Sequence, residues 1–124
     1  MNKNFNIFRL NCLLDDSDSA NFNGIILSLI HEVLFNNDNK ELSRSECFNY
    51  ISNDLKIKLE LDLFQEIIEK SKTLEISPVE DDLLIKLKSK KYKEISESIE
   101  QHSIERHIND FVIRKKLDSK YSDL

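Results

Sequence analysis

The pattern of apolar and polar positions divides the chain into stretches of two kinds. Apolar residues three or four positions apart are typical of an amphipathic helix, and they predict one from about Asn21 or Asn23 to Phe35. The four residues at 36–39, all Asn or Asp, end this helix. Asn and Asp tolerate a left-handed backbone better than other non-glycine residues, so they can make the chain reversals here.

Two further helices begin at capping-box patterns, in which a side chain accepts from the amide three residues later. Ser43 and Glu46 have this spacing and predict a helix that ends near Asp54. Asp62 and Gln65 have it too and predict a third helix, which fades at 71–73. Between them, residues 56–61 alternate apolar and charged side chains, which indicates a short strand or an extended connector.

Alternation along the chain, the period of a half-buried strand, occurs in three other stretches. Residues 5–14 predict a strand that pairs either with the sheet of this chain or with a neighbouring molecule. Leu74 to Ile76 and Leu83 to Leu87 flank a polar connection that contains Pro78, and together they predict a β-hairpin.

A final helical region covers Lys90 to Leu117. Its second half carries an apolar stripe that consists of Ile104, Ile108, Phe111 and Val112. This stripe either packs on the core of the chain itself or binds a second copy or another protein, as a helix in a groove does. We take it as the candidate partner-binding set.

Helix, helix, short extended segment, helix and two-stranded hairpin is an order that resembles a winged-helix domain. The resemblance implies that the third helix, Asp62 to Lys72, and the wing, Leu74 to Leu87, are the contact elements. In winged-helix proteins of known role, that helix usually enters the DNA major groove and the wing touches the DNA backbone.

The predicted fold class is α+β and mostly helical, within a single domain over residues 1–124. It comprises an N-terminal strand at 5–14, a winged-helix-like three-helix core with a small hairpin at 21–88, and a C-terminal helical extension at 90–117.

Composition supports this architecture. A single Gly and a single Pro in 124 residues argue against a β-dominated fold, and they leave no glycine-rich loop for a phosphate. Cys12 and Cys47 are too few for a disulfide scaffold, and we expect buried free thiols. With no signal-peptide core and no long apolar stretch, we expect a cytoplasmic protein that does not enter the membrane.

The distribution of charged residues distinguishes between protein binding and DNA binding for such a domain. The third helix carries Asp62, Glu66 and Glu69, and the wing tip carries an acidic run at 80–82. Acidic groups there disfavour DNA and favour protein contact. The alternative is a DNA-binding regulator that contacts phosphates through the lysines around the wing. These are Lys70, Lys72, Lys86, Lys88, Lys90, Lys91 and Lys93.

Candidate catalytic and metal groups are weak. His102 and His107 are five residues apart, which puts them on different faces of a helix. His31 has no ligand at metal-binding spacing and is expected to be a hydrogen-bonded boundary residue. Acidic runs at 15–18 and 80–82 fall in predicted exposed loops, whereas general acid–base catalysis needs a dry cleft. We therefore predict no enzyme, no cofactor and no small-molecule substrate.

The function expected from the sequence is a non-catalytic interaction or assembly module, either a homodimer or the binder of a protein partner. It would also suit the N-terminal domain of a larger multidomain protein.

Overall fold

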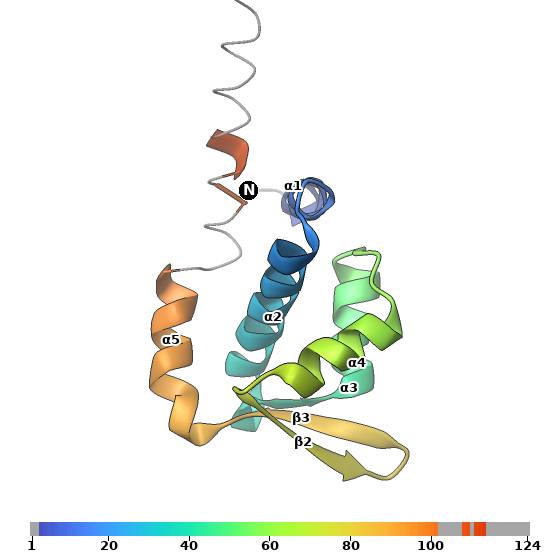
Figure 1. The fold of residues 1–124 in the computed structure, drawn as a ribbon, viewed down its shortest axis with the longest axis vertical. Helices are drawn as coiled ribbons and strands as arrows, with labels where there is room; N and C mark the ends of the chain where they lie inside the picture. The colour runs from blue at the N-terminus through green and yellow to red at the C-terminus, as the bar shows by residue number, and fades with distance from the viewer. Residues whose placement is uncertain (1–2, 102–107, 110, 114–124) are drawn as a thin grey trace, which may run out of the picture.

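Helices cover one face of a small three-stranded sheet in the computed structural model, which describes residues 3–101, 108, 109 and 111–113 (Figure 1). The longer helices are α1 (Lys3–Asp15), α2 (Ser19–Phe35), α3 (Arg44–Asn49), α4 (Leu61–Lys70) and α5 (Tyr92–Gln101). A π-helix, η2 (Tyr50–Asp54), continues α3, and η1 (Asp38–Lys40) and η3 (Ser89–Lys91) are single 3₁₀ turns. The strands are β1 (Glu41–Ser43), β2 (Leu74–Val79) and β3 (Asp82–Leu87). This is the predicted α+β, mostly helical fold.

The sheet is antiparallel, with β3 between β1 and β2. Its register sets Ile85 of β3 opposite Leu42 of β1 and Ile76 of β2. Side chains alternate between the two faces of a strand, so Ile85, which is fully buried, marks the face that packs on the helices. The next residue, Lys86, stands on the other face between Glu41 and Glu75. One face of the sheet is therefore core and the other carries charge.

Helix α2 runs through the core, and its Ile26, Ile30 and Leu34 are fully buried. Asp18 caps its N-terminus, where the carboxylate accepts from the amide of Asn21 at 2.8 Å. Its C-terminus at Phe35 is where the sequence predicts it. The helix begins at Ser19, before the expected Asn21 or Asn23, because Asp18 provides the cap.

Residues 5–14 are helical, so the predicted N-terminal strand is wrong. Among residues 7–14, the buried ones are Leu10, Leu13 and Leu14, which lie on one face of a helix. Phe8, which the alternating pattern would bury, is 64% exposed. Asn11 fixes α1 to the rest of the chain, because its side-chain amide donates to the carbonyl of Leu55 at 3.0 Å. A short apolar run fits both periods, and contacts with the core decide between them.

One of the two hydrogen bonds of the predicted capping box at Ser43 is confirmed. The Ser43 hydroxyl accepts from the backbone amide of Glu46 at 3.1 Å. The helical segment that follows ends at Asp54, as predicted. The second capping box is wrong: Glu60 precedes α4, and its side chain makes no capping hydrogen bond. Asp62 lies inside the first turn instead. Residues 56–60 are an extended connector and not a strand.

The predicted hairpin is present, but its strands are longer and its turn shorter than expected. Only Glu80 and Asp81 separate the two strands. Pro78 lies in β2 rather than in the turn. This is an edge strand, the usual place for proline in a sheet, since proline has no N–H to donate. Strand β1 was not predicted, because three residues that pair with a strand forty residues away leave little local signal.

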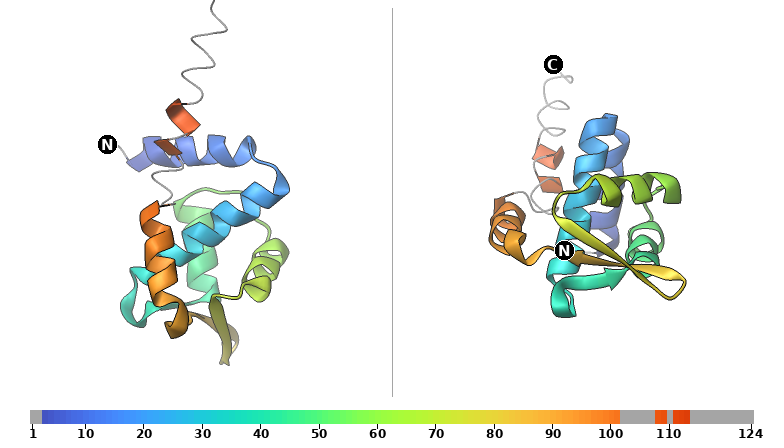
Figure 2. Two further views of the ribbon diagram at one scale, coloured as in Figure 1. Left: turned by 60° about the vertical axis from the view of Figure 1, so that its left-hand side comes forward. Right: turned by 60° about the horizontal axis from the view of Figure 1, so that its bottom comes forward.

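Helix α5 begins at Tyr92, two residues after the predicted Lys90, because η3 occupies the first turn. Its Ile95 is buried against the core. Farther along, Ile108 and Phe111 are also buried in the same cluster as Leu10 and Leu14 of α1. In Figures 1 and 2, residues 108, 109 and 111–113 lie at the α1 end of the molecule, away from the hairpin.

Among the residues that the structure describes, four other than glycine have a left-handed backbone, namely Asn39, Lys40, Lys56 and Glu80. The single glycine, Gly24, lies inside α2 and has no positive φ. Asn39 confirms that an asparagine makes a chain reversal after α2. The other three positions carry the larger steric cost of a β-carbon in this conformation.

Candidate functional site

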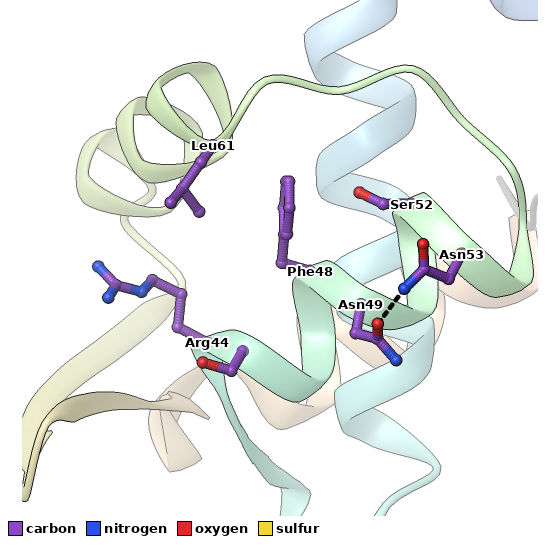
Figure 3. A pocket seen from close by; sticks show the side chains of 7 residues that line it. Arg44, Phe48, Asn49, Ser52, Asn53 and Leu61 are labelled. Carbon is purple, nitrogen blue, oxygen red and sulfur yellow. Dashed lines mark hydrogen bonds between the residues drawn. The ribbon is translucent and has the colours of Figure 1, made fainter.

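A hollow lies on the helical side of the molecule, between the α3–η2 segment and the start of α4 (Figure 3). Its volume is about 270 Å³. Phe48 extends from α3 into the space between the helices, and Leu61 points into it from the first turn of α4. The remaining lining residues are Arg44, Ser45, Asn49, Ser52 and Asn53. The hollow thus combines an apolar pair with hydroxyl and amide groups.

The π-helix η2 shapes one wall of this hollow. The amide of Leu55 donates to the carbonyl of Tyr50 at 3.0 Å, five residues back, instead of the α-helical four. Such wide turns are rare and occur frequently at functional sites. Ser52 and Asn53 of this turn belong to the lining. The local cause is the connector after η2, where Ile57 and Leu59 are buried and the amide of Ile57 bonds back to the carbonyl of Ile51 at 3.2 Å.

Arg44 connects the hollow to the hairpin. Its guanidinium donates to the side-chain carbonyl of Gln65 in α4 at 2.8 Å and lies 3.7 Å from the carboxylate of Asp82 in β3. The hydroxyl of Ser45 also donates to Asp82 and is the main cause that lowers the pKa of this carboxyl group. The backbone amides of Leu83 and Ser45 and the charge of Arg44 lower it further. Helix α3, helix α4 and strand β3 therefore meet at one ionic junction.

Ser52 has a buried hydroxyl oxygen with no hydrogen-bond partner in the part of the chain that the structure describes. Burying a hydroxyl without a partner costs free energy, so such groups are uncommon in folded proteins. Its neighbours Asn49 and Asn53 bond to each other through their side-chain amides. Of the polar groups in the lining, the Ser52 hydroxyl is thus the one with unused bonding capacity that is shielded from solvent.

The outward face of α4 is acidic. Asp62, Glu66 and Glu69 are exposed, whereas Phe64 and Ile68 are fully buried on the opposite face. Glu66 forms an ion pair with Lys70 one turn later, and Gln65 donates to Glu69 at 2.8 Å. The helix that the sequence predicts as the contact element thus presents mainly carboxylates.

The predicted lysine set is spread over several elements. Its members lie at the end of α4 and just after it, on β3 and just after it, in η3 and at the start of α5. Lys70 pairs with Glu66, and Lys91 pairs with Glu94 at 3.3 Å. Lys86 stands between two glutamates on the outer sheet face. Lys88 is half-buried, and Lys72, Lys90 and Lys93 are exposed.

The predicted partner-binding stripe lies only partly within the described residues. Ile104 lies outside them. Ile108 and Phe111 are 6% and 9% exposed and belong to the core of the chain itself, and Val112 is half-buried against that core. These positions favour the alternative in which the stripe packs on its own core. Ile113, just beyond the stripe, is 57% exposed.

The histidine and cysteine side chains that the structure describes are buried or half-buried. His31 lies 2.7 Å from the hydroxyl of Thr73 and is half-buried, as expected for a hydrogen-bonded boundary residue. Burial lowers its pKa. Cys47 is fully buried, and burial raises the pKa of its thiol to about 12, while Cys12 is half-buried. His102 and His107 lie outside the described residues.

No group of three or more metal-ligating side chains occurs within residues 3–101, 108, 109 and 111–113. The acidic runs of the sequence are exposed, except for Asp82, which is half-buried at the Arg44 junction. Within the same residues, no helix has both the length and the apolar character needed to cross a membrane.

Comparisons with known proteins do not extend this picture. No family model matches the chain, and no curated protein or solved structure matches it.

Proposed function

We propose that this chain is a winged-helix-like domain that binds protein rather than DNA and that performs no catalysis. The observation that carries this proposal is the acidic outward face of α4, with Asp62, Glu66 and Glu69 exposed. In the winged-helix arrangement, this helix is the one that would face a DNA groove. Carboxylates there would meet phosphates and base acceptors, and both contacts are unfavourable.

Element order supports the winged-helix part of the proposal. Helices α2, α3 and α4 are followed by the β2–β3 hairpin, which is the order on which the resemblance rests. Helices α1 and α5 are additions at either end. They contribute Leu10, Leu14 and Ile95 to the same core.

The proposal is tested by measuring the binding of random duplex DNA to the full chain over a salt series that starts at about 50 mM, where phosphate contacts are strong. We expect little binding at low salt. Tight binding with a steep loss on adding salt would overturn the proposal, provided that changing Lys88, Lys90 and Lys91 to Glu abolishes it. The DNA-binding regulator would then be correct.

The protein partner in this proposal is either a second copy of the chain or a different protein. Sedimentation of the full chain over a range of concentrations distinguishes the two, because a homodimer would show a mass that rises with concentration. A monomer at every concentration restricts the proposal to a different protein as partner.

A further inference from the structure

We propose that the hollow between α3–η2 and α4 is the docking site for a lysine-rich amphipathic segment of a partner protein. This inference rests on the proposed function and names the partner's chemistry. An apolar side chain of the partner would lie against Phe48 and Leu61, and its basic residues would face the acidic rim of the hollow.

The apolar part of the argument is Leu61. It is the first residue of α4 and is 48% exposed, although it points into a hollow next to the half-buried Phe48. The ring of Phe48 is backed by the fully buried ring of Phe64, with centroids 5.4 Å apart. A partner side chain would therefore meet a rigid aromatic surface. Rigid apolar pockets of this kind are where interfaces concentrate their binding free energy.

The polar part of the argument is the pair of asparagines in the lining. Asn49 and Asn53 both line the hollow, and both are exposed. The π-helix puts Asn53 at the rim, where an exposed side-chain amide can bond to a peptide backbone.

The charge of the rim selects the partner. Glu60 and Asp62 flank Leu61 and are both exposed, and Glu46 is exposed on α3. The one cation in the lining is Arg44, whose guanidinium is already bonded to Gln65 and paired with Asp82. The exposed carboxylates that adjoin the lining residues in the chain thus outnumber the single cation of the lining. A basic segment complements these carboxylates, while an acidic peptide or a nucleic acid would be repelled.

The test uses a fluorescent synthetic peptide of lysine and leucine, with leucines at i, i+3 and i+7 so that they share one helix face. Two comparison peptides replace the leucines with alanine or the lysines with glutamate. Affinity is measured by anisotropy on the full chain, and the bound surface is mapped by amide chemical shifts. We expect the lysine–leucine peptide to bind best and to shift residues of α3, η2 and the first turn of α4.

Matched variants separate docking from stability. Leu61→Ala should weaken the peptide Kd by about tenfold or more. The control, Val79→Ala, truncates an apolar side chain with the same 48% exposure on the hairpin and should leave the Kd unchanged. Asp62→Asn should weaken binding at low salt, whereas Asp81→Asn, at the hairpin turn, should not.

Three results would overturn the docking site. They are equal affinity for the lysine and glutamate peptides, an unchanged Kd in Leu61→Ala, and shifts centred away from the hollow. Absence of peptide binding would also overturn it. If DNA binding is absent as well, protein contact through another surface still stands, whereas lysine-dependent DNA binding refutes the proposed function itself.

Discussion

The carboxylate of Asp82, the first residue of β3, lies 3.7 Å from the guanidinium of Arg44, the first residue of α3. Asp82 also accepts from the Ser45 hydroxyl and from the amide of Leu83, the latter at 2.8 Å. Because Arg44 donates to Gln65 as well, this one ion pair fixes the hairpin to two helices. The orientation of the hairpin relative to the hollow depends on it.

Asp82→Asn should lower the midpoint of thermal unfolding at neutral pH. The hydrogen bonds and the nearby cation hold the pKa of Asp82 below its ordinary 3.8. A carboxyl group with a lowered pKa stabilises the folded chain above pH 3.8, and this contribution is lost as the pH falls through the folded value. The difference between wild type and variant should therefore shrink below pH 3.8. Asp81→Asn, one residue away and exposed, serves as the control and should match wild type throughout.

His31 predicts a second pH dependence. Burial lowers its pKa below 6.5, so an unfolded chain takes up the proton first as the pH falls. The free energy of unfolding should consequently decrease from about pH 7 downward, and His31→Gln should flatten that decrease. Urea denaturation at several pH values measures both curves. Parallel curves for the two proteins would contradict this account.

Gly24→Ala should raise the free energy of unfolding by about 1 kcal/mol, because glycine is a poor helix former. Gly24 is exposed inside α2, and a β-carbon added there meets no atom within 4 Å. A destabilised variant would show that the helix needs the glycine for a reason other than space.

Glu80→Gly should also stabilise the chain, by about 0.5–1 kcal/mol, since a β-carbon is costly at a positive φ. The φ of Glu80 is 54° in the two-residue hairpin turn. Denaturation midpoints measure the change, and Asp81→Gly, at the neighbouring position without a positive φ, is the control that should gain nothing.

Phe111→Ala should destabilise the fold by about 3 kcal/mol, as expected for loss of a buried aromatic side chain. Ile113→Ala, two residues on and 57% exposed, should change stability by less than about 0.5 kcal/mol. Equal small effects at both positions would mean that Phe111 does not contribute to the core in solution.

Cys47 should resist thiol reagents in the folded protein. Its thiol is fully buried with a pKa of about 12, so almost no thiolate is present near neutral pH. In a Cys12→Ser variant, labelling should occur only at the rate of unfolding. Rapid labelling of that variant would contradict the buried position.

Local signals in the sequence predict much of the fold. The Asn run after Phe35, the Ser43 cap and the alternation on both sides of Pro78 each mark an element that is present. The prediction fails where two periods fit one run, as at residues 5–14, and where an element depends on a distant partner, as β1 does. It also fails at the start of α4, where a capping pattern exists but an earlier residue begins the helix.

The sequence predicts less of the candidate site than of the fold. The acidic face of α4 is visible in the sequence because exposed charges alternate with buried apolar residues. The hollow is not, because no residue pattern marks a π-helix, and the Arg44 junction joins three segments far apart in the chain. The exposed position of Leu61 follows only from the geometry of the connector that precedes it.

Pro78 has a consequence for the protein at high concentration. In β2, the backbone N–H and C=O groups of residues 75, 77 and 79 face β3, as the register of the two-residue hairpin requires. The backbone N–H and C=O groups of Leu74 and Ile76, and the C=O group of Pro78, therefore face away from β3, toward the open edge of the sheet. Pro78 brings no N–H to that edge, which leaves two donors for an incoming strand. A strand of another molecule that paired with this edge would therefore make only a short ladder of backbone hydrogen bonds. The β2 edge can be exposed to solvent without serving as the start of a fibre.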